Sequence, residues 1–240
     1  MSIIEGLLRK GVKSLSEFES KLFLAQYGIP ITKEALVNNE HDAVTTAYEI
    51  GYPVALKGSG EAIRHKTELN LIALNLRDEN QVRRAFIELT ANSKVKVEGI
   101  LVQQMIKDDR ELMVGLSRDA QLGPCVMFGL GGIFAELLED VSFRVAPLNR
   151  WDAKDMMNEI RGKKVLDLFR GMPPVDREAL ADILLSVGQI GMDHEEVSEI
   201  DINPLKLADG KPVAVDALVV FRTGKGSSIG EKQNRPKRTS

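Results

Sequence analysis

Two carboxylates and an amide near the end of the chain could hold a metal ion. Asp201 and Asn203 stand two positions apart, and Asp216 lies in the next apolar stretch. Residues two apart on a strand point to the same face, and an antiparallel neighbour could bring Asp216 beside them. Carboxylate and amide oxygens suit Mg²⁺, which shares its remaining coordination positions with water and phosphates. The alternative is an Asx turn with solvated acids.

A lysine and a glycine-rich turn could bind phosphate. Lys57 ends an apolar stretch and is followed by Gly-Ser-Gly, so its ammonium could reach a nucleotide phosphate as a point charge. The alternative is a lysine at a strand end that extends into solvent. The GLGG run at 129–132 allows backbone N–H groups to approach an anion. It matches neither the Walker nor the Rossmann spacing, so a tight turn between a strand and a helix is the competing interpretation.

A histidine and an arginine could take part in phosphate transfer. His65 stands in a polar run with basic neighbours, and an imidazole can accept phosphate covalently. Without such a role, it would be an ordinary exposed loop histidine. Arg144 interrupts an apolar strand, so it either pairs with an acid, with Glu136 and Glu139 as candidates, or meets a phosphate.

Interleaved helices and strands must position these residues. A capping box at Ser16 and Glu19 begins a helix that has Phe18, Leu22 and Ala25 on one face. The last two strands are joined through a turn at 208–211. The interleaving predicts an α/β or α+β protein. Further helices are expected over 42–50, 78–90, 152–160 and 176–194, and strands over 54–57, 71–76, 99–106, 111–116, 125–128, 141–147, 197–202 and 213–221.

The composition is that of an ordinary globular protein. The net charge of −3, with 43% hydrophobic and 28% charged residues, gives no global indication of nucleic acid or a membrane surface as a partner. The single Cys125 excludes a disulfide framework. Since we find neither a signal peptide nor a membrane span, we expect a cytoplasmic protein. Residues 223–240 are basic and poor in apolar residues, which predicts a disordered tail.

Seven short motifs, taken in order, resemble the ATP-grasp subunit of ADP-forming acetyl-CoA synthetases, and more distantly the β subunit of succinyl-CoA synthetase. The resemblance covers about residues 15–221 and implies an ATP-grasp fold, with two lobes of mixed or antiparallel sheet and helices and the nucleotide between them. Residues 1–222 would form this domain, with a small lobe over about 20–104 and the remainder in the large lobe. The motifs are PVALK at 53–57, HKT at 65–67, GILVQQM at 99–105, REL at 110–112, FGLGGIF at 128–134, DVSFR at 140–144 and EIDINP at 199–204.

The resemblance also implies roles for single residues. Lys57 matches a lysine that contacts nucleotide phosphates, and His65 matches a mobile-loop histidine that relays phosphate. Arg144 matches a position that lines the phosphate site. The implied Mg²⁺ ligands are Asp201, Asn203 and Asp216, and the remaining implied nucleotide contacts are Gln103, Gln104, Met105 and Ile106 in the hinge, Glu111 at the ribose, and Gly131 and Gly132 at the phosphates.

The histidine loop departs from the family pattern. The family follows its histidine with Lys-Ser-Asp, one variable residue and then Gly-Gly-Val, whereas this chain has Asn70 and Leu71 where the glycines stand. Glycines at these positions would give the loop freedom to swing. The loop therefore either moves differently or transfers phosphate less well.

The implied reaction converts an acid, CoA and ATP into acyl-CoA, ADP and phosphate. The chain lacks room for CoA-binding and acyl-phosphate domains, so we expect a hetero-oligomer whose α-type partner subunit binds CoA and the acid. Two alternatives remain. A carboxylate–amine ligase would work alone without His65, and a nucleotide-sensing regulatory subunit would bind Mg-ATP or ADP without becoming phosphorylated.

Overall fold

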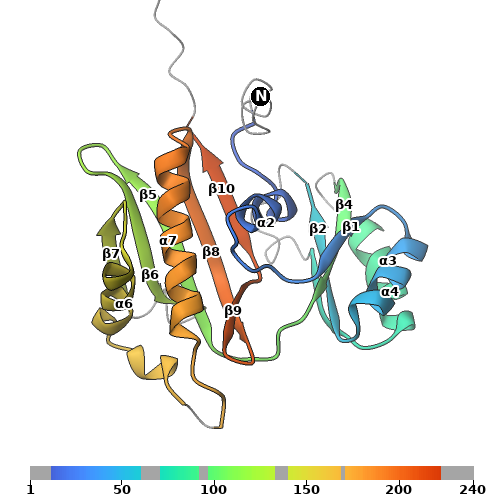
Figure 1. Cartoon of the computed structure of the whole chain (residues 1–240). Helices are drawn as coiled ribbons and strands as arrows, with labels where there is room; N and C mark the ends of the chain where they lie inside the picture. Colours follow the sequence, from blue (N-terminus) through green and yellow to red (C-terminus); the bar gives the residue numbers. More distant parts are fainter. Residues whose placement is uncertain (1–11, 61–70, 92–96, 133–139, 169–170, 223–240) are drawn as a thin grey trace, which may run out of the picture.

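The computed structural model describes residues 12–60, 71–91, 97–132, 140–168 and 171–222 (Figure 1). His65 and the tail at 223–240 lie outside the described residues. The chain forms two lobes, each built on an antiparallel sheet with helices, which confirms the expected α/β (α+β) class. No helix in the described part of the chain has the length and apolar character that a membrane span requires.

The small lobe is a four-stranded sheet in the order β1-β4-β2-β3, covered on one face by α3 and α4. Val54 and Leu56 of β2 point into the core beneath these helices, and Val102 of β4 joins them. The lobe contains β1 (Glu34–Val37), α3 (Glu40–Ile50), β2 (Val54–Ser59), β3 (Ile72–Leu76), α4 (Glu79–Ala91) and β4 (Gly99–Gln104). The sequence analysis did not predict β1.

The large lobe is a six-stranded sheet in the order β10-β8-β5-β6-β7, with β9 paired to β8. Helices α6 and α7 cover one face, and α2 packs beside β10 (Figure 1). The lobe contains α2 (Glu17–Ala25), β5 (Glu111–Asp119), β6 (Gly123–Leu130), β7 (Val141–Val145), α6 (Arg150–Glu159), the 3₁₀ helix η1 (Lys163–Leu166), α7 (Arg177–Asp193), β8 (Val197–Ala208), β9 (Lys211–Ala214) and β10 (Ala217–Phe221).

The last three strands correct the expected pair over 197–202 and 213–221. β8 is one long strand, and the turn at 208–211 joins it to β9. The chain then continues along β8, because β9 pairs with the second half of β8 and β10 with the first half. Val215 and Asp216 form the short connection between β9 and β10, and the Val215 N–H donates to the Pro204 carbonyl at 3.1 Å.

Helix α2 begins with the expected capping box at Ser16 and Glu19, but its buried face differs from the expected one. Glu17, Lys21 and Leu24 are buried, whereas Leu22 is 45% exposed. Leu24 packs in the core of the large lobe. The small lobe was expected to start at about residue 20, but the part of α2 from Ser20 to Ala25 packs on the large lobe.

Candidate functional site

The small lobe turns a polar face toward the large lobe. Alternation along β2 directs Lys57 away from the apolar core that holds Leu56. On the next strand, Gln103 pairs with Ala55 and also with Glu34 of β1. Lys57 and Gln103 are 5% and 1% exposed, so this face is covered by other parts of the protein.

The large lobe contributes acids from β8 and from the β9–β10 connection. Ile200 and Ile202 point into the apolar core, so Asp201 and Asn203 lie on the opposite face. Ala217 pairs with Ile202, and therefore Asp216, one residue earlier, lies beside Asn203. The structure thus brings together the three expected metal ligands.

The pKa of the Asp201 carboxyl is affected by the acids around it. Burial, together with the negative charges of Glu199 and Asp216, raises the pKa of Asp201 to about 6. A cation bound beside these groups would oppose all of these effects. Glu199 was not among the expected site residues, although it lies two positions before Asp201 on the same face.

The two lobes meet at the carbonyl oxygen of Val215. This oxygen accepts hydrogen bonds from the Gln103 amide at 2.7 Å, the Lys21 ammonium at 3.1 Å and the Lys57 ammonium at 3.4 Å. Because Val215 immediately precedes Asp216, the phosphate-binding candidate Lys57 comes close to the metal-binding candidates. This lobe interface therefore places a lysine near a group of acids, the charges that a site for a metal–nucleotide complex requires.

The buried acids and bases around this carbonyl were missed by sequence analysis. Glu17 accepts from both Lys21 and Lys57 at 2.8 Å, and Glu34 accepts from Lys21 and Gln103. The available signal was the spacing of Glu17, Lys21 and Leu24, which places the three on one helical face.

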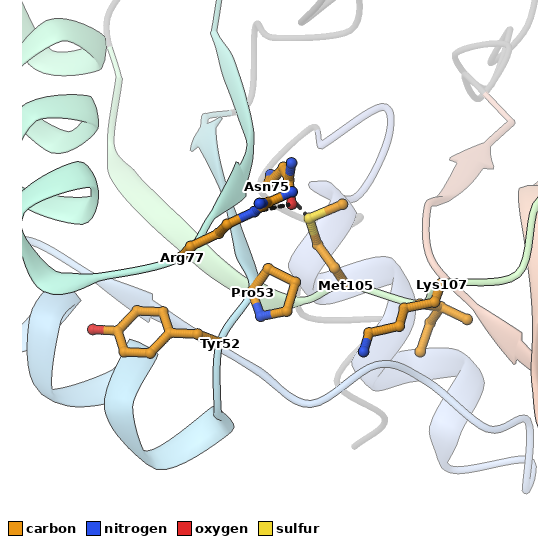
Figure 2. Close-up of a pocket in the computed structure, with 7 residues that line it drawn as sticks. Tyr52, Pro53, Asn75, Arg77, Met105 and Lys107 are labelled. Carbon is orange, nitrogen blue, oxygen red and sulfur yellow. Dashed lines mark hydrogen bonds between the residues drawn. The ribbon is translucent and has the colours of Figure 1, made fainter.

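Cavities lie on the hinge that connects the lobes. One, of about 510 Å³, is shown in Figure 2, where Pro53 and Met105 are among the residues that line it and Arg77 extends toward Asn75. A second, of about 480 Å³, lies between the hinge and the β8–β9 turn. Gln104, Met105 and Ile106 line the second cavity, and Met105 and Ile106 also line the first. These three expected hinge residues are thus beside space that a nucleotide base could enter, whereas Gln103 lines neither cavity.

Glu111, Gly131 and Gly132 lie together at the start of β5. The Gly131 N–H donates to the Glu111 carbonyl at 2.7 Å, and the Glu111 carboxylate pairs with Lys206 at 3.1 Å. Gly132 has a φ of +61°, and a Cβ there would collide with the Glu111 carboxylate. A Cβ on Gly131 would lie 2.7 Å from the Leu112 carbonyl oxygen. The absence of a side chain at Gly131 and Gly132 therefore allows their backbone to lie close to Glu111 and Leu112.

Arg144 does not lie at the interface between the lobes. It pairs across the strands with Val126, whose side chain lies in the core beneath the helices, so Arg144 points to the helix-covered face. Its guanidinium binds Asp155 and Glu159 of α6, each at 2.6 Å. The expected role at the phosphates is corrected, because strand alternation directs the side chain to the opposite face. The expected acidic partners, Glu136 and Glu139, lie outside the described residues.

The chemistry of the acidic cluster fits Mg²⁺. Asp201, Asn203 and Asp216 offer hard oxygen ligands, the kind that Mg²⁺ takes together with water and substrate phosphates. In the part of the chain that the structure describes, no group of three or more His, Cys, Asp and Glu side chains forms a metal cage. The proposed ligand set has only two carboxylates, since Asn203 supplies an amide oxygen. Water and phosphate oxygens would have to fill the remaining coordination positions of Mg²⁺.

The fold and the site define a family. A family model described as an ATP-grasp domain matches residues 6–221, and the chain belongs to this family. Among its relatives, the β subunit of acetate–CoA ligase (ADP-forming) I from Pyrococcus furiosus is 41% identical, over 87% of this chain and 92% of the relative. Acetate–CoA ligase (ADP-forming) I of Archaeoglobus fulgidus is 40% identical over 91% of this chain, which spans only 32% of that relative.

Solved structures of similar sequence have the same fold as this chain. The acetyl-coenzyme A synthetase 1 of Ca. Korarchaeum cryptofilum, in complex with coenzyme A and Ca-AMPCP, matches with a TM-score of 0.88 at 44% identity, over 92% of this chain and 98% of that chain. A second structure of that protein holds coenzyme A and Mg-AMPPCP, with its phosphohistidine segment pointing towards the nucleotide binding site, and matches with a TM-score of 0.81 at 43% identity over the same shares of both chains. The ATP-grasp fold expected from the motifs is confirmed.

Proposed function

We propose that this chain is the nucleotide-binding subunit of an ADP-forming acyl-CoA synthetase, and that it relays phosphate between ATP or ADP and a histidine. The observation that supports this most directly is the meeting of Lys57 and the Asp216 segment at the Val215 carbonyl. Phosphoryl transfer requires little more than positioning and charge neutralisation from a protein. Lys57 of the small lobe and the acids of the large lobe, which meet at this interface, would supply both.

Each group at the lobe interface has a defined part in this proposal. Lys57 neutralises phosphate charge, while Asp201, Asn203 and Asp216 would hold Mg²⁺, which would supply further positive charge to the phosphates. The base lies against the hinge, where Gln104, Met105 and Ile106 present backbone groups and Gln103 supports them from within the sheet. Glu111 binds the ribose, and the Gly132 N–H faces the phosphates, since the Gly131 N–H already donates to the Glu111 carbonyl.

The histidine in the relay is His65. Its imidazole nitrogen forms a bond to the transferred phosphorus as the bond from phosphorus to the ADP oxygen breaks, and ADP leaves with that electron pair. The phosphohistidine segment of the Korarchaeum synthetase, which points towards the nucleotide binding site in one complex, supports such a relay in this family.

A partner subunit completes the reaction in our proposal. It binds CoA and the carboxylic acid, so the present chain alone converts no acid to acyl-CoA. The β-subunit relatives support a hetero-oligomer, and the longer Archaeoglobus ligase supports fusion of the same parts in one chain. Measurable synthetase turnover by the purified single chain would contradict this division of roles.

The nucleotide site is tested by calorimetric binding of ADP, with Mg²⁺ and with EDTA. We expect Lys57→Met and Asp216→Asn each to weaken Mg-ADP binding by about tenfold or more, because each removes a charge that faces the metal–phosphate complex. Arg144→Met is the matched control, because its guanidinium lies on the other face of the sheet. Unchanged affinity in both site variants would refute the proposed site.

A further inference from the structure

We propose that Lys21 of α2 is a positioning residue for the nucleotide site, because it offsets part of the charge of Glu17 and so leaves Lys57 more available to a nucleotide phosphate. This inference rests on the proposed function, in which Lys57 binds phosphate. It concerns two residues of an N-terminal helix that none of the seven motifs includes.

Lys21 occupies an unusual position for a lysine. Its side chain is 0% exposed, and charged ammonium groups are rarely buried unless they are paired. It donates to Glu17 at 2.8 Å, to Val215 O at 3.1 Å and, through a short contact, to Glu34. All three donor positions of the ammonium are therefore used. These acceptors come from α2, β1 and the β9–β10 connection, so Lys21 joins both lobes.

Glu17 is shared between two cations. The same oxygen, Oε1, accepts from Lys21 and from Lys57, each at 2.8 Å. Both lysines and Glu17 are nearly inaccessible to solvent, at 0%, 7% and 3% side-chain exposure. Because charges interact strongly where water is excluded, a change in one of them alters the others.

Removal of Lys21 alone would change what Lys57 does. Glu17 would stay buried and negatively charged, and Lys57 would be drawn more strongly to it. A nucleotide phosphate would then have to compete with the Glu17 carboxylate for the Lys57 ammonium. With Lys21 present, its ammonium is shared between Glu17 and Glu34, so the charge of Glu17 is partly offset and Lys57 can turn toward phosphate at lower electrostatic cost.

A purely structural role for Lys21 makes a different prediction. Loss of a buried cation would lower the folded fraction, but the protein that remains folded would bind Mg-ADP normally. Removing Glu17 as well would then not restore affinity, since affinity had not been lost. The two accounts therefore differ in the dissociation constant of the folded protein.

The test measures Mg-ADP binding to the full chain by calorimetry, with the folded fraction fixed by circular dichroism. We expect Lys21→Met to weaken binding by about tenfold, the size typical of groups that orient ligand-binding residues. The double variant Lys21→Met/Glu17→Gln should recover most of this loss, because it removes the competing carboxylate. Normal affinity in Lys21→Met, or no recovery in the double variant, would overturn the inference.

Two further variants keep the inference testable. If Lys21→Met does not fold, Glu17→Gln alone should bind Mg-ADP at least as tightly as the wild type, and weaker binding would overturn the inference. Arg118→Met is the control, because Arg118 is a partly buried cation that likewise has three acceptors, but these are the carbonyls of Gly191, His194 and Val197, none of which belongs to the proposed site. Lys57→Met separates the two claims: if it leaves affinity unchanged, the proposed phosphate site itself has failed.

Discussion

The substitution Asp201→Asn should make the chain more stable and its metal–nucleotide binding weaker. The pKa of Asp201 is raised to about 6 by burial and by the charges of Glu199 and Asp216, against an ordinary value of 3.8. Each unit of difference corresponds to about 1.4 kcal/mol, so the charged form costs up to about 3 kcal/mol in the folded state at neutral pH. Since Asp201 is only half-buried and asparagine must also be desolvated, we expect about 1–2 kcal/mol of stabilisation.

The pH dependence has a definite sign. A carboxyl whose folded-state pKa is raised binds more protons in the folded than in the unfolded protein between about pH 4 and pH 6. The wild type therefore loses stability through this group as pH rises across that window. The Asp201→Asn variant lacks this loss, so its advantage in unfolding free energy should be small at pH 4 and complete above pH 7.

Urea denaturation at several pH values, without Mg²⁺ or nucleotide, measures this directly. Glu88→Gln, at an exposed acid on α4, is the matched control and should shift the unfolding free energy very little at any pH. Calorimetry on the same variants should show weaker Mg-ADP binding for Asp201→Asn alone. Equal or lower stability of Asp201→Asn at pH 7.5 would refute the electrostatic reasoning.

Two more predictions follow from the geometry. Arg144→Met should lower the unfolding free energy by about 1 kcal/mol or less, because its acidic partners are partly exposed. Arg144 and Ser142 lower the pKa of Glu159 to about 2, so this contribution is present above pH 4.5 and is lost toward pH 2. Plots of unfolding free energy against pH that stay parallel for the two proteins would contradict this. Glu111→Gln should reduce the preference for ADP over 2′-deoxy-ADP, measured as a ratio of dissociation constants; an unchanged ratio would remove Glu111 from the ribose site.

Sequence alone predicted most of the elements but not their faces. Apolar runs located β2 and β4, and the expected strand over 197–202 is the first half of β8. The apolar pattern could not tell that Arg144 points beneath α6, since a strand pattern fixes which residues share a face and not what that face meets. The short strand β1 was missed because it has only three apolar residues and begins with Glu34, whose side chain is buried together with its partners Lys21 and Gln103.

The prediction of the buried face of α2 was wrong for a related reason. Glu17 and Lys21 are charged, so an apolar-pattern argument assigns them to solvent and buries Leu22 instead. In the folded protein their partners come from distant parts of the chain, Lys57 and the Val215 carbonyl among them. Burial of a charge depends on such long-range pairing, which no local pattern contains. The metal-binding candidates were easier to predict, because Asp201 and Asn203 are local neighbours on one strand.

The central claim, a phosphate relay through a histidine of this chain, is tested most directly by labelling. The chain is mixed with its partner subunit, identified by co-purification, and supplied with γ-labelled ATP and Mg²⁺. We predict acid-labile, base-stable label on the partner that is lost in His65→Ala and kept in His41→Ala, a variant of an exposed histidine on α3. No label on either chain, with Mg-ADP binding intact, would contradict the relay and identify a nucleotide-sensing subunit instead.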